Sequence, residues 1–242
     1  MKNVLIPTTL KPDTLKAIKT AVRNANGENI KIVLLMLSEM PDGISDLLFT
    51  IKATYETTVN EQRVLDECRK YVKDYEKIYL QVHHQTGISA PLLKNIMHHH
   101  AVGLVILTPS FKAETKSIYR HTTALLNNCD CPILHLTEKV EELVLDQAIF
   151  VQNAPTRISM EEVQQMMRKE FDLRVVSQAT LKEGQNPEDL SPVLVETIEK
   201  NHIDLLIETR KPEKPRVRAS KNGQSNTLAE KLGVPVLTLF EN

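Results

Sequence analysis

The chain has 242 residues, 41% of them hydrophobic and 25% charged, with 30 basic residues against 31 acidic ones. A chain of this length buries about 70% of its unfolded surface, so it needs neither disulfides nor a metal to form a core. The balanced charge excludes a global attraction to nucleic acid or membranes. The three cysteines lack the spacing of a disulfide framework, and no apolar stretch approaches the ~18 residues of a membrane span. These features predict a cytoplasmic protein.

The first half of the chain alternates strand and helix patterns. Val4–Ile6 predicts a short buried strand, and Pro12-Asp13 opens a helix that ends at Gly27. The continuous apolar run Ile30–Leu37 is typical of a strand covered on both faces in a parallel sheet. The further elements predicted in this half are two helices within residues 44–75, a strand at Ile78–Val82, a helix from Ser89, a strand at Gly103–Leu107, a helix at Ile118–Asn128 and a closing strand at Cys131–Leu136.

The second half repeats part of this order. The succession of helix, strand, loop, helix and closing strand over Asn95–Glu138 returns about a hundred residues later and ends at Leu239. One strand-helix unit is missing, and we place the gap between Val151 and Leu173. The elements predicted here are strands at Ala148–Val151, Leu173–Ser177, Ile203–Ile207 and Val236–Leu239, and helices that begin near Ser159, Pro187 and Thr227.

Strands joined by helical crossovers predict the fold class. We expect an α/β protein of two tandem doubly wound parallel-sheet domains, at residues 1–138 and 145–242, of which the second is shortened. The short charged segment Glu138–Leu143 links them, so the halves stay close to each other.

Three motifs carry a resemblance to a known family. They are Pro7-Thr8-Thr9 followed by Asp13, the strand Val102–Leu107 that leads into Thr108, and the closing strand Cys131–Leu136. In order and spacing they resemble those of tandem universal stress proteins, over residues 1–137 and more faintly over 146–242. The resemblance implies a binding or regulatory protein of the stress response.

The resemblance also implies self-association. Separate chains of this family pack through their closing strands, so we expect an intramolecular pseudo-dimer in which Ile133–Leu136 lies against Val236–Leu239. Both strands follow a proline, which favours an extended entry, and both need cover for their outer edge. A homodimer of the whole tandem is a further expectation.

The nucleotide site of the family has lost its motif residues in the first half. Nucleotide-binding members carry an aspartate after the first strand, where Thr9 stands here. Their glycine motif after the fourth strand brings backbone N–H groups to the triphosphate, and the matching positions here are Thr108, Phe111 and, for the third glycine, a position near His121. Phe111 adds bulk where the phosphate cradle is open. The resemblance therefore implies that the first half does not bind ATP, and we expect no cofactor.

A cationic loop in the second half predicts a different ligand. Basic residues run from Arg210 to Lys221, and Gly223 lies close to the third glycine of the family. Cations beside a helix N-terminus favour a small anion such as phosphate, whereas the alternative is a solvated loop that ends in an ordinary N-cap. The residues of this hypothesis are Arg216, Arg218, Asn222, Gly223, Gln224, Ser225 and Asn226.

Other chemistry finds little support in the sequence. His83-His84 and His98-His99-His100 invite a metal hypothesis, but consecutive histidines at a helix end point in different directions, so we predict no metal site. The motifs of hydrolases, Walker-type ATPases and zinc proteases are absent, and we expect no enzyme. Two other functions remain open: an adenine-nucleotide-binding switch or ATP-dependent enzyme, and a structural partner-binding module.

Overall fold

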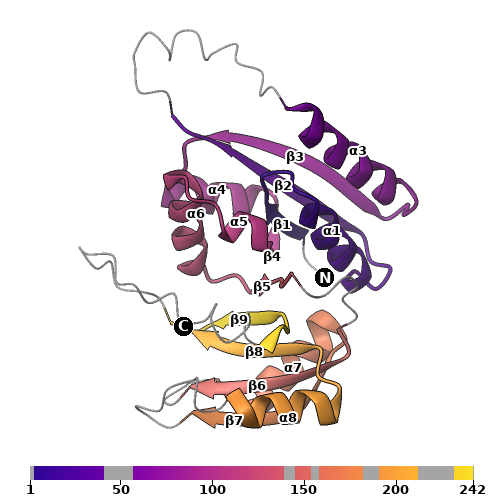
Figure 1. Cartoon of the computed structure of the whole chain (residues 1–242), viewed down its shortest axis with the longest axis vertical. Coiled ribbons are helices and arrows are strands. Elements are labelled where there is room, and N and C mark those ends of the chain that lie inside the picture. Colours follow the sequence, from indigo (N-terminus) through magenta and orange to yellow (C-terminus); the bar gives the residue numbers. More distant parts are fainter. Residues whose placement is uncertain are drawn as a thin grey trace, which may run out of the picture.

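The computed structural model describes residues 3–40, 57–138, 145–153, 158–181, 191–211 and 232–241 (Figure 1). The described elements of the first half are β1 (Asn3–Pro7), α1 (Asp13–Asn24), β2 (Ile30–Ser38), α3 (Val59–Lys73), β3 (Ile78–Thr86), α4 (Ala90–His99), β4 (Val102–Leu107), α5 (Pro109–Lys112), α6 (Ser117–Asn127) and β5 (Ile133–His135). Those of the second half are β6 (Gln147–Asn153), α7 (Met160–Phe171), β7 (Arg174–Leu181), α8 (Ser191–Asn201), β8 (Leu205–Arg210) and β9 (Val236–Phe240).

The described strands form one continuous nine-stranded sheet in the order β3-β2-β1-β4-β5-β9-β8-β6-β7. Every neighbouring pair is parallel except β5 and β9. Figure 1 shows β3 at one end of the sheet and β7 at the other. The predicted α/β class with a doubly wound, mostly parallel sheet is confirmed.

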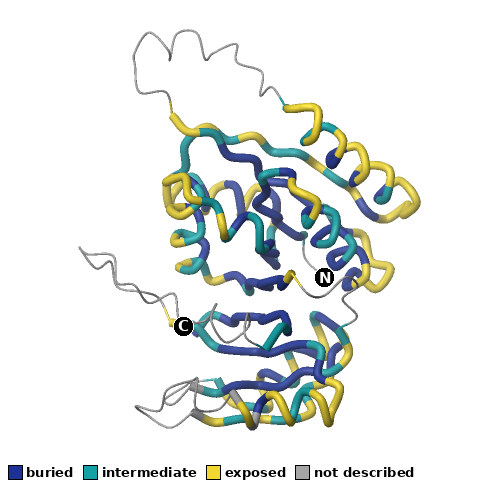
Figure 2. The backbone as a smooth tube through the Cα atoms, in the orientation of Figure 1, coloured by how far each residue is buried: buried dark blue, intermediate teal, exposed yellow. Residues whose placement is uncertain are grey.

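Helices cover both faces of this sheet. One apolar cluster joins the strands to α1, α3 and α7, and it continues from the first half into the second. On the opposite face, α4, α5 and α6 cover the first half and α8 covers the second. Figure 2 shows the central strands mostly buried, and the edge strands β3 and β7 and the outer turns of the helices more exposed. Burial on both faces explains why β4 and residues 32–37 of β2 carry no polar side chain.

Local signals account for where the helices begin. Thr58 and Ser159 each form a capping box with a glutamate three residues later, at the starts of α3 and α7. Asp13 lies in the first turn of α1, as predicted, and the chain leaves this helix through Asn26 and Gly27, which both have positive φ.

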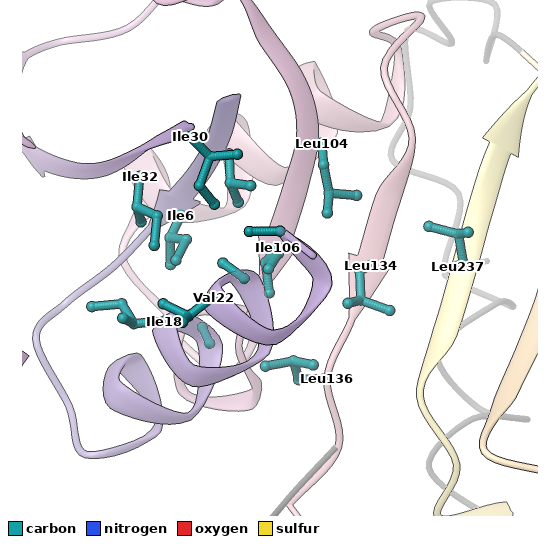
Figure 3. Packing of buried hydrophobic residues seen from close by; sticks show 14 of the residues in the cluster. Ile6, Ile18, Val22, Ile30, Ile32, Leu104, Ile106, Leu134, Leu136 and Leu237 are labelled. Carbon is teal, nitrogen blue, oxygen red and sulfur yellow. The ribbon is translucent and has the colours of Figure 1, made fainter. Parts of the chain in front are cut away.

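The two closing strands pair with each other. Ile133, Leu134 and His135 lie opposite Thr238, Leu237 and Val236 in an antiparallel register. Figure 3 shows Leu134 and Leu237 on these neighbouring strands, beside the apolar side chains of the first half. The predicted contact between the closing strands is therefore confirmed.

Three predictions about the elements are wrong. The strand predicted at Leu173–Ser177 continues to Leu181 as β7, because it stays paired with β6. The third strand extends to Thr86, four residues beyond Val82, because its whole length pairs with β2 even where its side chains are polar. The place of the missing unit also differs. Because β7 lies beside β6 as β2 lies beside β1, the position that β3 fills in the first half has no counterpart among the described strands, and the gap falls after β7.

Candidate functional site

The carboxyl ends of β1 and β4 form the place where an open α/β sheet usually binds its ligand. These strands are neighbours, but the chain leaves β1 toward the face covered by α1 and leaves β4 toward the face covered by α5 and α6. In open α/β sheets, ligands bind in the crevice between two such connections, so this switch point is the place to look for a site. Thr9 follows β1 and Thr108 follows β4, so two of the predicted site positions lie at this crevice.

Two polar contacts bridge the crevice. The Asp13 carboxylate accepts hydrogen bonds from the Ser110 backbone N–H at 2.8 Å and from the Ser110 hydroxyl at 2.7 Å. Beside this contact, the Lys11 ammonium lies 2.7 Å from a Glu114 carboxylate oxygen. The loop after β1 is therefore tied directly to the segment after β4.

The backbone N–H groups after β4 already have acceptors within the protein. The Ser110 N–H donates to Asp13, as described, and the Phe111 N–H donates to the Thr108 hydroxyl at 3.3 Å, which caps α5. The Lys112 N–H donates to the Thr108 carbonyl. A phosphate at this point would have to displace these acceptors, one of which is a carboxylate that would also repel it.

Phe111 fills the space that a phosphate loop leaves open. Its side chain is 1% exposed and packs edge-to-face on Tyr119, with the ring centroids 5.4 Å apart. The predicted bulk at this position is thus part of the core that lies beneath α4 and α6.

Thr9 and His121 make no described contact with the other two predicted positions. Thr9 is half-buried, and in the described part of the chain its hydroxyl has no hydrogen-bond partner. The turn around it is held instead by the Thr8 hydroxyl, which accepts from the backbone of Leu10, a residue with a positive φ of 53°. His121 is exposed on α6, and no described hydrogen bond or ring contact joins its side chain to Thr9, Thr108 or Phe111.

The second polar cluster lies where the halves meet and is centred on Arg210. The sequence places this residue in a loop that binds anions, which is wrong, because it ends β8 and its guanidinium binds neutral oxygens. It satisfies carbonyl groups at the end of α6, where a cation is favoured by the helix dipole. Burial lowers its pKa to about 10. Its donors reach the Asn127 carbonyl at 3.1 Å, the Thr238 carbonyl and hydroxyl at 2.7 and 2.8 Å, the Cys129 carbonyl at 2.8 Å and the Cys131 carbonyl.

Two buried titratable groups lie next to this cluster. Glu208, in register with Val151 and Thr238, is 7% exposed, and burial raises its pKa to about 7. Within the described ranges no hydrogen bond or ion pair reaches its carboxyl group. His135 lies 3.5 Å from the Thr238 hydroxyl, and burial, with smaller effects of Lys112 and Arg210, lowers its pKa to about 3. A glutamate within the apolar run of β8 is a sequence signal that motif reasoning missed.

The rest of the predicted anion site is only partly described. Lys211 lies 3.8 Å from a Glu241 carboxylate oxygen. The residues Arg216, Arg218, Asn222, Gly223, Gln224, Ser225 and Asn226 lie outside the described residues, so a phosphate site there stays a prediction.

The histidines form a pair that spacing did not reveal. His100 Nε2 and His83 Nδ1 are 3.2 Å apart, and the His99 ring packs on His100 with a centroid distance of 4.7 Å. Over the part of the chain that the structure describes, no group of three or more His, Cys, Asp or Glu side chains is placed to hold a metal ion. The same part holds no helix long and apolar enough to cross a membrane.

Comparisons with known proteins support the fold. The sequence matches no protein-family model and no curated protein. Among solved structures, the chain is similar to a universal stress protein from Archaeoglobus fulgidus DSM 4304, with 9% identity, a TM-score of 0.51, and coverage of 99% of this chain and 97% of that one. A functionally unknown protein from Pseudomonas aeruginosa PAO1 is similar at 13% identity and a TM-score of 0.51, over 100% of this chain and 93% of that one. At these identities the likeness concerns the fold alone, which this chain shares with the universal stress proteins.

Proposed function

We propose that this protein is a universal stress protein-like binding or regulatory protein of the stress response, built from two such domains, with no ATP site in its first half and no catalytic activity. One observation carries the proposal. The N–H groups that would meet a phosphate at the carboxyl end of β4 already donate to Asp13 and to the Thr108 hydroxyl. The shared fold supports a universal stress protein-like protein, and the hydrogen-bonded N–H groups after β4 support the lack of an ATP site in the first half.

The bridged crevice favours a role that does not turn over a nucleotide. A ligand there would have to break three contacts: the two hydrogen bonds between Asp13 and Ser110, and the ion pair between Lys11 and Glu114. Because a hydrogen bond to a charged group contributes about 1.5–3 kcal/mol, most of the binding energy of a phosphate would be spent on opening the site.

Calorimetric titration with MgATP tests this proposal. We expect no binding at micromolar concentrations by the purified chain, and no adenine nucleotide among the small molecules released from it. The matched variant is Thr108→Trp, which adds bulk at a fully buried position directly after β4 and is compared with the parent once circular dichroism shows that it folds. Micromolar binding that Thr108→Trp removes would place ATP in the first half and overturn the proposal. Binding that survives the substitution would locate a nucleotide elsewhere and favour the switch or enzyme.

The two alternatives differ in what the purified protein carries. A nucleotide switch or ATP-dependent enzyme requires bound adenine nucleotide or its turnover, whereas a structural module requires neither and shows only a protein partner. The antiparallel contact of β5 with β9 supports an intramolecular pseudo-dimer in all three cases. We further propose a homodimer of the chain, which sedimentation of the purified protein tests.

A further inference from the structure

His100 joins three elements at the edge of the first half. It follows α4, is 1% exposed, and its backbone carbonyl accepts a hydrogen bond from the Asn3 side chain at 2.6 Å. The Asn3 side chain also accepts from the Lys31 N–H at 2.9 Å, which ties the start of β1 to β2. On its other side, His100 contacts His83 of edge strand β3 at 3.2 Å. The His83–His100 contact thus connects β3 to the end of α4.

The protonation state of this contact follows from what each nitrogen can reach. His100 Nδ1 is buried and has no hydrogen-bond partner among the described residues. An unpartnered N–H in such a place costs more than an unpartnered lone pair. The favourable neutral arrangement is therefore the one in which His100 Nε2–H donates to His83 Nδ1, while His100 Nδ1 carries no proton.

Adding a proton costs this contact something in every arrangement. A proton on His83 Nδ1 removes the acceptor, so that two N–H groups face each other. A proton on His100 Nδ1 buries a charged donor without an acceptor. If the bond reverses, so that His83 donates to His100, the proton of His100 moves to the same buried Nδ1. No protonated state keeps the hydrogen bond and also gives every buried ring N–H an acceptor.

The surroundings of His100 add to this cost. The pKa of His100 is lowered by burial first and then by His83 on β3, His99 on α4 and Lys31 on β2. All three neighbours that act on it are basic, and Asn3 on β1 does not titrate. No carboxylate is among the groups that shift it, so nothing there offsets a positive charge.

We propose that the contact between His83 and His100 is a pH-sensitive hydrogen bond, which holds edge strand β3 against the end of α4 at neutral pH and releases it on acidification. The inference stands apart from the proposed function, because it uses neither the crevice nor a ligand. It gives the protein a direct response to a fall in pH.

Amide hydrogen exchange of the full chain tests this pH-sensitive hydrogen bond. The protection factors are corrected for the effect of pH on the intrinsic exchange rate. A histidine kept neutral by the fold makes opening about tenfold easier for each pH unit below its ordinary pKa of 6.5. Between about pH 7.5 and about pH 5.5, we therefore expect amides of β3 and of the last turn of α4 to lose up to about tenfold in protection.

Matched variants assign the response. His100→Phe keeps a buried ring that cannot titrate, and His83→Gln keeps an acceptor for the His100 N–H. His100→Phe is expected to reduce the loss to less than about threefold, because no buried imidazole is left to protonate. His83→Gln leaves His100 buried and neutral, so it should retain the loss, as should His121→Gln at an exposed site. Equal protection of the parent at the two pH values overturns the proposal, as does a full loss in His100→Phe. Loss removed by His84→Gln alone would assign the response to the opposite face of β3 and also overturn it.

Discussion

Arg210 is a half-buried cation whose five acceptors are all neutral oxygens. Its planar fork reaches carbonyl groups on two sides, which a lysine ammonium with three donors cannot do. We expect Arg210→Lys to lower the free energy of unfolding by about 2–4 kcal/mol, because at least two buried carbonyls lose their donor. Urea denaturation measures this loss.

Arg63 provides the control for this substitution. It is an exposed arginine, 4.0 Å from Glu67 on the same helix. Arg63→Lys should change stability by less than about 0.5 kcal/mol. If Arg210→Lys is as mild as Arg63→Lys, the guanidinium does not hold the end of α6 as described.

Glu208 should make the protein less stable as the pH rises. Its pKa is 4.5 when exposed and about 7 in the folded protein. Below about pH 4.5 the carboxyl is protonated in both states and costs nothing, and the stability is lost progressively as the pH rises through about 7. Leucine occupies the corresponding end of β4, at Leu107. Glu208→Leu should therefore stabilise the protein by up to about 3 kcal/mol more at pH 8 than at pH 5.

The measurement is the difference between this variant and the parent in urea at the two pH values. Because it is a difference, the opposite pH dependence of His100 cancels. An effect of Glu208→Leu that is the same at both pH values would mean that the carboxyl is not buried without a partner.

At the scale of elements, Asp13 links α1 to α5. Its carboxylate accepts two hydrogen bonds from Ser110, and an asparagine in the same place offers one oxygen and an N–H pair that meets donors. We expect Asp13→Asn to cost about 1–3 kcal/mol in thermal or urea unfolding. Lys11→Met, which removes the ion pair with Glu114 at a half-exposed lysine, should cost less than about 1 kcal/mol. Equal costs would show that the crevice is not closed chiefly by Asp13.

The elements show where sequence patterns succeed and where they fail. Apolar runs and caps predicted most strands and helices of the described chain, because burial on both faces and satisfied helix ends depend on neighbouring residues. The hydrophobic pattern predicted that β3 ends at Val82, which is too early, since pairing with β2 continues through polar side chains. The place of the missing unit depended on which strand lies beside β6, which no local pattern reports.

In the candidate sites too, the sequence predicts which residue stands at a position but not which distant residues come into contact. The presence of Thr9 and Phe111 at the positions that the resemblance assigns to an aspartate and a glycine could be stated from the sequence, because it concerns only which residue stands at each position. The contact of Asp13 with Ser110 joins residues 97 positions apart, and that of Arg210 with Cys129 joins residues 81 positions apart. Such contacts depend on the order of strands and on which face each connection takes.

At the scale of the whole molecule, the halves share one core. Leu134 and Leu237 are paired across β5 and β9 and belong to the apolar cluster that runs from α1 to α7. Loss of packing on either side of this junction removes contacts from both halves. We therefore expect the chain to unfold as one cooperative unit, although its sequence repeats.

Leu237→Ala tests this expectation, because the chain reports on its halves separately. The chain has no tryptophan, and its five tyrosines all lie between residues 55 and 119. Tyrosine fluorescence therefore follows the first half, whereas far-UV circular dichroism follows both halves. Removing a fully buried leucine costs about 2–5 kcal/mol. Because the halves are expected to unfold together, the substitution in β9 should shift the tyrosine and dichroism transitions by the same amount, while Val59→Ala, at a side chain 88% exposed, shifts neither. If the tyrosine transition of Leu237→Ala stays at the parent midpoint while part of the dichroism signal is lost earlier, the halves unfold separately, and the β5–β9 contact joins them without coupling their stability.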